Sequence, residues 1–483
     1  MNAEKVIKSV GTGGIFKYAV GEGAFSIAMN GMGNFGMLYM TLILGLGASW
    51  ASLAVGLAIL LDAILDPIMG HISDNTHSRW GRRHPYILIG GLLMAVSFAL
   101  FWWIPQYFSN TYVLFALVFG INLLIRAMSS VLIIPFTALG FEICPEYESR
   151  SRLQGVRYFI SQAVNFTFGA LAWTLFFKDG ADASGKIIDG TLIESNYLKM
   201  GVTLAVAIAV LSSLCCWGTR AFARDNRSEK VSGNNLKEFW LAFTSIFKDR
   251  LAVLVFVFFI VAQFSMMLMG QVQMFTYVFY MKFSAVEKTC VHGAGMLAFA
   301  LASLNLSKVV KRLDKKGAGY VGIALAISGG LGLMTVFNGG LIEPGQTFDL
   351  FGITLPLATI VFGLLQICWW GGCGMVVPLA SSMVADAAAI NHKKTGVLKN
   401  ASYAAVFSFS TKAAGSVGMF LTGAMVDLSG IIPGAKVQTP EAIHNIALMT
   451  FLCGPIVIFC SMLILRRYPV TREFMENIDK KAS

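Results

Sequence analysis

The sequence predicts an all-α integral membrane protein in which twelve transmembrane helices form two six-helix bundles. Apolar residues make up 56% of the 483 positions and charged residues only 13%, whereas an average soluble domain has about 25% charged residues. The apolar residues fall in blocks of about 20, the length that a helix needs to cross a bilayer. Blocks such as residues 251–262 lack the strict alternation of a barrel strand, and lipid admits only helices and closed barrels.

The predicted spans fall into two sets of six, separated by a polar stretch at residues 220–250. The first set lies at residues 18–46, 50–71, 86–104, 112–139, 153–177 and 200–219. The second set lies at residues 251–280, 291–310, 319–338, 353–380, 399–427 and 444–465. Paired bundles are common among large membrane proteins with many spans. We therefore expect an amino-terminal bundle (1–222), a cytoplasmic central loop (223–250) and a carboxyl-terminal bundle (251–483).

The distribution of Lys and Arg predicts the orientation, because basic residues concentrate on the cytoplasmic side of membrane proteins. With both termini in the cytoplasm, only six of the 37 basic residues fall in loops on the opposite side and three fall inside spans. This topology explains the net charge of +11 without nucleic acid. The basic cytoplasmic segments are instead expected to contact anionic membrane lipid.

Motifs for catalysis or for a resident metal are missing from the sequence. The eight cysteines and six histidines show no zinc-ligand spacing. No Ser/His/Asp set, His-rich motif or nucleotide-binding loop indicates a membrane-embedded enzyme. We expect no enzyme activity and no bound cofactor.

A few ionisable residues fall inside the predicted spans, where a charge costs about 3 kcal/mol unless it is paired or lines a water-filled cavity. They are Glu22, Asp62, Asp66, Arg126, Arg157 and Lys412. Asp62 and Asp66 stand four apart, so both carboxylates lie on one helix face. Because they repel each other, we expect a cation or a proton between them. Sodium at Asp62 and Asp66 is the single metal that the sequence suggests. The alternative is pairing with Arg157 or Lys412, and a cation that displaces the lysine would unite both hypotheses.

The segment that follows predicts a cytoplasmic gate. Asp74 is followed by Arg79, Arg82 and Arg83 in a short turn between two spans. Salt bridges between the aspartate and these arginines would latch the cytoplasmic side and break when it opens. The alternative is a basic turn that only sets the topology.

Residues 62–81 resemble the glycoside–pentoside–hexuronide:cation symporter family of the major facilitator superfamily. The most specific match is Asp62-Ala-Ile-Leu-Asp66-Pro-Ile-Met-Gly70, followed by Ser78-Arg-Trp-Gly81. Weaker matches, spread over both halves, are Pro135-Phe136, Arg157-Tyr-Phe, Val384-Ala-Asp386 and Lys412. The resemblance implies the major facilitator fold. It also implies a monomeric symporter in the bacterial inner membrane that moves a small sugar-like solute with Na⁺ or H⁺.

The resemblance also implies roles for individual residues. Asp62 and Asp66 resemble the cation ligands, and Ser130 falls where the family has a hydroxyl near the cation. Lys412 resembles the lysine between the cation and sugar sites, and Arg157 resembles the arginine near the sugar. Asp386 joins the predicted cytoplasmic gate.

Three positions depart from the family pattern. Asn30 stands at the end of Ile27-Ala-Met-Asn30, where the family has a sugar-binding aspartate. Ile133 replaces a second aspartate, and Leu65 replaces an asparagine that is common in sodium users. The remaining balance of Arg126, Arg157 and Lys412 against two aspartates favours an acidic sugar or an oligouronide, because guanidinium groups pair well with carboxylates.

The predicted substrate site combines charged, amide and aromatic side chains. Its members are Asn30, Arg126, Arg157, Tyr277, Trp369, Trp370 and Lys412. Gln263, Gln271 and Gln273 are further polar candidates for the same cavity. Two other functions remain open at this point: a proton-coupled carrier of a neutral disaccharide and a sodium-coupled carrier of a lysolipid.

Overall fold

The computed structural model describes most of the chain. The described residues are 12–74, 76, 78–104, 110–144, 147–181, 185, 187–224, 244, 246–350, 353–395, 400–471 and 474. The greater part of the predicted central loop, residues 225–243 and 245, lies outside this set.

Long helices make up the described amino-terminal half. α1 (Thr12–Leu38) continues into the π-helical turn η1 (Tyr39–Ile43), and α5 (Tyr147–Val164) continues through η2 (Asn165–Ala170) into α6 (Ala172–Phe176). The remaining elements are α2 (Ala48–Asp74), α3 (His84–Phe101), α4 (Thr111–Ile143), β1 (Gly180–Ala181), β2 (Ile187–Ile188), η3 (Gly190–Leu192), α7 (Glu194–Thr219) and η4 (Arg220–Arg224).

The described carboxyl-terminal half repeats this helical pattern. Its elements are α9 (Arg250–Phe275), η5 (Thr276–Tyr280), α10 (Ala285–Leu333), η6 (Met334–Asn338), β3 (Phe348–Leu350), β4 (Ile353–Leu355), α11 (Leu357–Thr395), α12 (Asn400–Leu428) and α13 (Pro440–Leu465). Asp314, with φ 61° and ψ 173°, breaks α10 into two parts. The Tyr280 hydroxyl before the first part donates to the Phe337 carbonyl after the second, at 3.0 Å. The two parts therefore run antiparallel.

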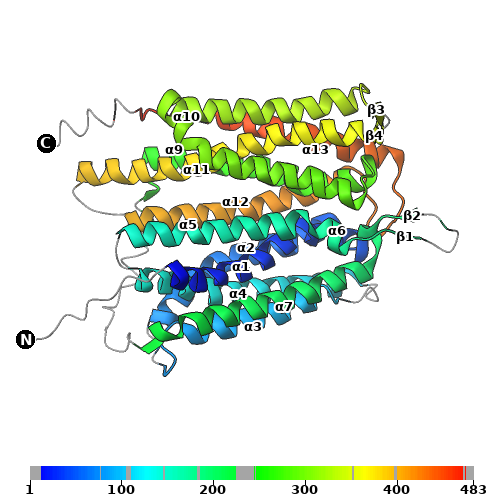
Figure 1. Ribbon diagram of the computed structural model, residues 1–483. Coiled ribbons are helices and arrows are strands. Elements are labelled where there is room, and N and C mark those ends of the chain that lie inside the picture. The colour runs from blue at the N-terminus through cyan, green and yellow to red at the C-terminus, as the bar shows by residue number, and fades with distance from the viewer. Residues whose placement is uncertain are drawn as a thin grey trace, which may run out of the picture.

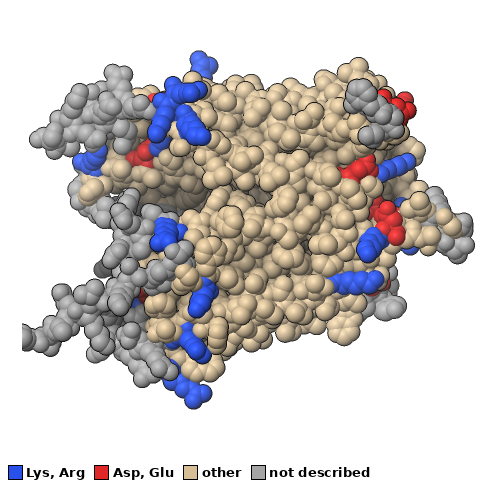
Figure 2. All heavy atoms as spheres, viewed as in Figure 1, with Lys and Arg blue, Asp and Glu red and all other residues tan. Residues whose placement is uncertain are grey.

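The helices are arranged side by side with their ends at two opposite faces of the molecule (Figure 1). We call the face with β1–β2 and β3–β4 the strand end. The opposite face, the basic end, carries Arg79–Arg83, Lys311–Lys316 and Arg466–Arg467. α1 starts and α13 ends at the basic end (Figure 1). Figure 2 shows the charged residues of the visible face gathered near the two ends, with an uncharged band between them. Such a band is what hydrocarbon requires.

Eight described helices are long and apolar enough to cross a membrane. α1, α5 and α12 are not among them within the described residues. These three helices carry Glu22, Arg157 and Lys412. Polar residues are tolerated within a membrane where a helix lines a cavity or pairs its charges. The low apolarity of the three helices therefore indicates that they lie around an interior polar site.

Contact between the two halves depends largely on α2 and α12, which pack along each other. Small residues permit this close approach. A Cβ atom added to Gly56 would lie 2.5 Å from the Phe420 ring, and one added to Gly423 would lie 1.9 Å from Ser52 Oγ. Side chains at either glycine would push the two helices, and with them the two halves, apart.

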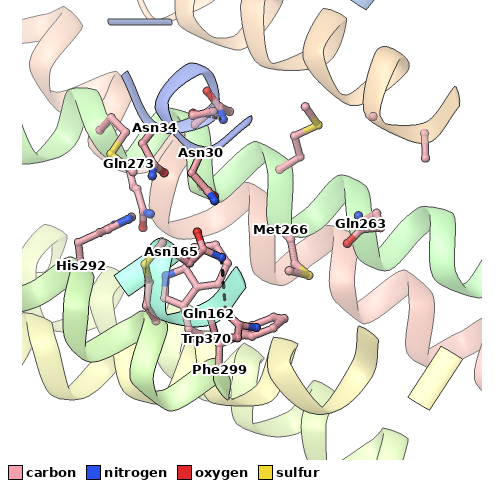
Figure 3. Close-up of a pocket in the computed structure, with 18 residues that line it drawn as sticks. Asn30, Asn34, Gln162, Asn165, Gln263, Met266, Gln273, His292, Phe299 and Trp370 are labelled. Atoms are coloured by element: carbon pink, nitrogen blue, oxygen red, sulfur yellow. Dashed lines mark hydrogen bonds between the residues drawn. The ribbon is translucent and has the colours of Figure 1, made fainter. Parts of the chain in front are cut away.

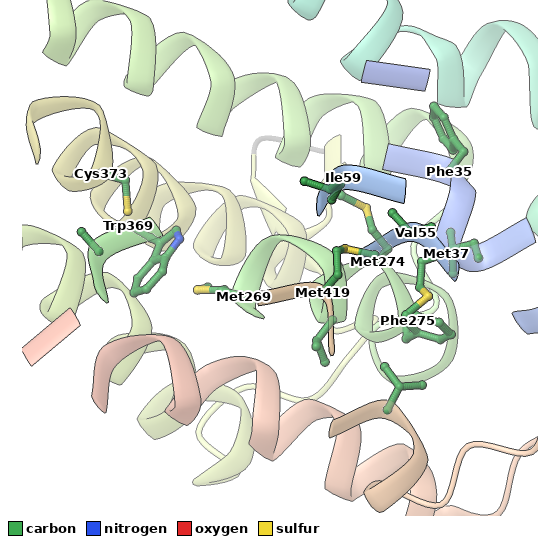
Figure 4. Packing of buried hydrophobic residues seen from close by; sticks show 14 of the residues in the cluster. Phe35, Met37, Val55, Ile59, Met269, Met274, Phe275, Trp369, Cys373 and Met419 are labelled. Carbon is green, nitrogen blue, oxygen red and sulfur yellow. The ribbon is translucent and has the colours of Figure 1, made fainter. Parts of the chain in front are cut away.

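An apolar layer also joins the two halves. Met37 of α1, Val55 of α2, Met274 of α9 and Met419 of α12 are all buried and belong to one hydrophobic cluster (Figure 4). Helices from both halves therefore share a core, in the part of the molecule between the interior site and the strand end.

Candidate functional site

Two acidic residues, a serine and a lysine meet at the interface of α2, α4 and α12. Lys412 Nζ lies 2.8 Å from Asp62 Oδ2 and 2.5 Å from Asp66 Oδ2. Ser130 Oγ lies 2.6 Å from Asp62 Oδ1 and 2.7 Å from Asp66 Oδ1. We call these four residues the carboxylate cluster. The spacing of Asp62 and Asp66 along α2 places both carboxylates on the face that meets α4 and α12.

The Ser130 hydroxyl lies within hydrogen-bond distance of both carboxylates of the carboxylate cluster. It has one hydrogen, so it can donate to only one carboxylate at a time. Its approach to the second carboxylate is favourable when that group carries a proton or when a cation neutralises it. Asp62 also interacts electrostatically with Arg126. The cluster thus offers oxygen ligands from three side chains in a setting where added positive charge is favourable. Among the described residues, no three His, Cys, Asp or Glu side chains form a metal site.

Arg157 has a partner of its own in the amino-terminal half. Its guanidinium lies 2.7 Å from Glu22 Oε2 and 4.9 Å from the centre of the Phe136 ring. Tyr18 stacks on the Phe136 ring, with ring centres 4.3 Å apart. Glu22 neutralises the charge of Arg157, so this structure does not present it as a free anchor for a substrate.

A cavity of about 470 Å³ with both polar and apolar lining lies between the two halves. Seven carboxamides and four methionines are part of its described lining, which carries no Asp, Glu, Lys or Arg (Figure 3). The lining includes Asn30, Asn34, Gln162, Asn165, Gln263, Gln271, Gln273, His292, Phe299 and Trp370. Side chains of this kind donate and accept hydrogen bonds without a net charge. The volume is within the range of about 300–1,000 Å³ that is typical of small-molecule sites.

Two of the predicted substrate residues, Asn30 and Trp370, line the cavity. Trp370 packs over Gly295, where an added Cβ would lie 2.5 Å from its ring. Lys412 is in the carboxylate cluster, two and three residues along α12 from the lining residues Ala414 and Gly415.

Tyr277 and Trp369 lie elsewhere. Both are 0% exposed and are absent from the described lining. Tyr277 packs against Phe283 and Phe362. The Trp369 ring fills the space above Gly454, where an added Cβ would lie 2.6 Å from it. Both side chains are part of the core of the carboxyl-terminal half, and the prediction that they contact substrate has no support from their positions.

Arg126 occupies a different environment from Arg157. Its guanidinium makes no hydrogen bond or ion pair with any residue that the structure describes, apart from the electrostatic interaction with Asp62. It is partly buried. Arg126 therefore has unused hydrogen-bond donors, and it is not part of the described lining of the cavity.

The predicted gate residues form separate networks within each half at the basic end. Arg82 Nη2 lies 2.7 Å and Arg83 Nε 3.0 Å from Glu142 Oε1. Their partner is thus Glu142 of α4, which no motif in the sequence indicated. Arg79 lies near the Trp80 ring, at 5.8 Å. The Asp74 side chain is outside the described part of the structure.

The gate residue of the other half, Asp386, contacts two partners. Its Oδ2 lies 2.6 Å from Lys315 Nζ and 3.1 Å from the Tyr468 hydroxyl. Burial and the neighbouring Asp386 carboxylate raise the pKa of the Tyr468 phenol above its ordinary value.

The strand end is closed by contacts that the sequence did not predict. Asp427 at the end of α12 accepts hydrogen bonds from the backbone amides of Ala48 (3.0 Å) and Ser49 (2.9 Å) at the start of α2. Lys288 forms an ion pair with Asp189. Each contact joins one half to the other, so no motif within a single segment could have indicated it.

Further bonds between the halves lie at the same end. The hydroxyls of Thr174 and Thr289 are 2.6 Å apart, and the Gly434 amide donates to the Thr41 carbonyl at 2.9 Å. Together with Asp427 and Lys288, they separate the cavity from the strand end. On the visible face, Figure 2 shows an indentation between the halves toward the basic end.

Comparison with known proteins agrees with this architecture. A family model described as MFS/sugar transport protein matches residues 17–472. The chain belongs to the MFS/sugar transport protein family. The glucuronide carrier protein homolog of Escherichia coli (strain K12) is 24% identical, covering 97% of this chain and 95% of that protein. The isoprimeverose transporter of Lactiplantibacillus pentosus is also 24% identical, covering 92% and 85%.

A solved structure supports the fold. A bacterial homolog of the human lysosomal transporter Spinster, in an inward-facing and unoccupied conformation, has a TM-score of 0.69 at 10% identity. The alignment covers 96% of this chain and 97% of that chain. The predicted resemblance to the glycoside–pentoside–hexuronide:cation symporters is confirmed. The chain is a multi-pass membrane protein and a sugar or glycoside transporter of the major facilitator superfamily, not an enzyme.

Proposed function

We propose that this MFS/sugar transport protein is a symporter that couples a glycoside to Na⁺ or H⁺ by alternating access. The observation that carries the proposal is the position of Lys412 of α12, which bridges Asp62 and Asp66 of α2. The same oxygens that hold the two halves together are those that a cation would bind. Cation binding and the movement of the halves are therefore expected to influence each other, which is the condition for coupling.

The proposed architecture is twelve spans in an amino-terminal bundle (1–222) and a carboxyl-terminal bundle (251–483). α10 supplies two spans through its break at Asp314, and α5 with η2 and α6 supplies one. Both termini are proposed to be cytoplasmic, because the basic end has the runs of Lys and Arg that mark that side. The contacts at Asp427 and Lys288 then close the outer side, and the cavity opens toward the cytoplasm.

Alternating access would require these outer contacts to break while the basic-end networks approach each other. Rocking of two bundles about a central site is the usual mechanism for this architecture. The predicted gate residues Arg82, Arg83 and Asp386 are already paired within their own halves. Their proposed role is to exchange these partners for residues of the opposite half when the cytoplasmic side closes.

An acidic sugar or an oligouronide is the substrate class that we favour. Arg126 has no hydrogen-bond partner among the described residues and is available to a carboxylate. The carboxamides of the cavity suit sugar hydroxyls, and Trp370 suits the apolar face of a sugar ring. One similar protein is named a glucuronide carrier protein homolog.

A proton-coupled carrier of a neutral disaccharide is the second candidate. The observation in its favour is that the described lining of the cavity carries no charged side chain. A sodium-coupled lysolipid carrier receives less support, because the seven carboxamides of the described lining would lack hydrogen-bond partners beside an acyl chain.

Asp66→Asn tests the coupling role. In proteoliposomes, purified wild-type protein is expected to accumulate a glycoside when a Na⁺ or H⁺ gradient is imposed. The variant is expected to exchange labelled for unlabelled solute across the membrane without accumulating it, because the neutral amide no longer attracts the cation. Asp349→Asn, an exposed acid at the strand end, is the matched control and is expected to behave as wild type. Gradient-driven accumulation by Asp66→Asn would refute the assignment.

A further inference from the structure

The end of the cavity that faces the strand end, which we call its closed end, holds polar atoms without a hydrogen-bond partner among the described residues. His292 is 5% exposed and Gln273 is 0% exposed. Both ring nitrogens of His292, Nε2 of Gln273 and Nδ2 of Asn34 make no hydrogen bond among the described residues. Gln273 Oε1 is already engaged, because it accepts from Gln366 Nε2 at 3.0 Å. Buried groups of this kind are destabilising unless a ligand or water completes their hydrogen bonds.

These three side chains converge from three separate helices. Asn34 comes from α1, Gln273 from α9 and His292 from α10, so both halves of the protein contribute. Figure 3 shows them pointing toward one another at one end of the cavity, with Gln263 at the other. All three belong to the cavity lining. Their convergence forms a separate recognition site, which we call the closed-end subsite.

The chemistry of the closed-end subsite fits uncharged hydroxyls. The two amide groups donate, and a neutral imidazole donates through one nitrogen and accepts through the other. A hydroxyl group can accept from the first and donate to the second. No Asp, Glu, Lys or Arg is part of the described lining. The subsite can therefore satisfy a polyhydroxylated ring, while it lacks a counter-charge for a carboxylate.

The cavity is longer than one sugar ring. Gln263 and Met274 both line it, and a helical rise of 1.5 Å per residue places them about 16 Å apart along α9. The open end lies near the carboxylate cluster, because Gln263 and Lys412 are thirteen and twelve residues from the starts of α9 and α12. A ring at the closed-end subsite is thus separated from Lys412 by most of the length of the cavity.

We propose that the closed-end subsite of Asn34, Gln273 and His292 binds an uncharged terminal ring of a substrate with at least two sugar units. The other unit, acidic or neutral, then lies at the open end, toward Lys412. This inference rests on the proposed function and adds the size of the substrate and the residues that select it. Gln273 and His292 are specificity-determining residues, since a single sugar at the open end would not reach them.

The test compares the affinities of the purified protein for single sugars and for disaccharides built from them. The probes are glucose, xylose and glucuronate, together with disaccharides that contain each of them. In the wild type, the tightest disaccharide is expected to bind about tenfold or more tightly than its component sugars, because each added hydrogen bond contributes roughly a factor of two to ten. Gln273→Leu and His292→Phe are expected, each independently, to abolish most of this advantage and to leave the affinity for glucuronate, whose carboxylate the subsite does not accommodate, within about twofold.

Gln263→Leu is the matched control at the open end and is expected to weaken glucuronate and the disaccharides equally. Retained binding of glucuronate shows that the two closed-end variants are folded. Equal losses for glucuronate and the disaccharides, or no loss in either variant, would overturn the subsite. Equal affinities in the wild type would also overturn it while leaving cation-coupled sugar uptake intact. A wild type that binds none of the saccharides would instead overturn the proposed function.

Discussion

Replacing Lys412 by methionine is expected to tighten cation binding at Asp62 and Asp66. The ammonium group lies 2.8 Å and 2.5 Å from the Oδ2 atoms of these residues, where it occupies the position that a cation would take. The side chain of Lys412 is 24% exposed, and those of Asp62 and Asp66 are 7% and 22% exposed. Lys412 and the cation therefore compete for the same partly buried oxygens.

The size of the effect follows from this degree of burial. An exposed ion pair contributes about 0–1 kcal/mol, whereas removing one partner of a fully buried pair costs about 3–5 kcal/mol. The Lys412 contacts are between these cases, so the competing interaction is about 1–3 kcal/mol. Removing it corresponds to cation binding that is about 5–150-fold tighter.

Thermal unfolding of the purified protein measures this change. Sodium chloride is titrated at constant ionic strength with choline chloride as replacement, since a ligand of the folded state stabilises it by RT ln(1 + [L]/Kd). The sodium concentration needed for a given stabilisation is expected to fall in Lys412→Met. Lys412→Arg keeps the charge and should not show this fall. Lys315→Met, which removes the partner of Asp386 at the basic end, controls for the loss of any lysine. Equal sodium dependence in the wild type and Lys412→Met would refute competition between the lysine and sodium.

Two further substitutions test the substrate anchor and the outer closure. Arg126→Ala is expected to weaken binding of uronides by about tenfold or more, since a hydrogen bond to a charged group contributes about 1.5–3 kcal/mol. A competition assay with neutral glycosides as the control measures this loss. Equal losses of affinity for uronides and neutral glycosides would contradict a carboxylate-binding role of Arg126. Asp427→Ala removes the acceptor of two amides at the start of α2 and is expected to destabilise the outward-closed state by about 1–2 kcal/mol. Longer distances between spin labels at residues 112 and 437, in a cysteine-free background, would report this opening. Asp349→Ala serves as the control, and an unchanged distance distribution in Asp427→Ala would argue against the latch.

Helix positions were predictable to the extent that they coincide with apolar blocks. The predicted spans 251–280 and 399–427 agree with α9–η5 and α12 within one residue at each end. The predicted span 353–380 starts four residues early, because β4 occupies its first residues, and ends fifteen residues before α11 does. Hydropathy marks the part of a helix within hydrocarbon, and α11 continues as a helix beyond that part.

The carboxylate cluster was predictable where residues close together in the sequence indicate it. The four-residue spacing of Asp62 and Asp66 indicated a shared face, and their pairing with Lys412 was one of the two hypotheses. Glu142, the partner of Arg82 and Arg83, was missed because its contacts bring together segments that are distant in the sequence.

The cavity was predictable only in part. Gln263, Gln271 and Gln273 were identified as polar cavity candidates and line it, whereas Asn34 and His292 were missed. A single polar residue in a span forms no repeating pattern. The sequence therefore does not distinguish a position that faces the cavity from a position whose side chain is hydrogen-bonded in the core. The low apolarity of the segment that carries Gln162 and Asn165 was a usable signal, because a helix facing lipid on most sides would not tolerate it.

The charge balance of the site gives a physical reason for coupling an acidic sugar to a cation. Asp62 and Asp66 carry two negative charges, and Lys412 and Arg126 carry two positive charges, so the empty site is neutral. A bound cation alone or a bound uronate alone leaves one net charge, which a membrane interior strongly disfavours. Loading both restores neutrality, so the empty and the doubly loaded carriers are expected to reorient more readily than either singly loaded form. A neutral glycoside with a cation would leave one positive charge. Uptake of a uronide with Na⁺ should therefore carry little current across a planar membrane, whereas uptake of a neutral glycoside with Na⁺ should be electrogenic. A uronide current as large as that of the neutral glycoside would exclude this account of coupling.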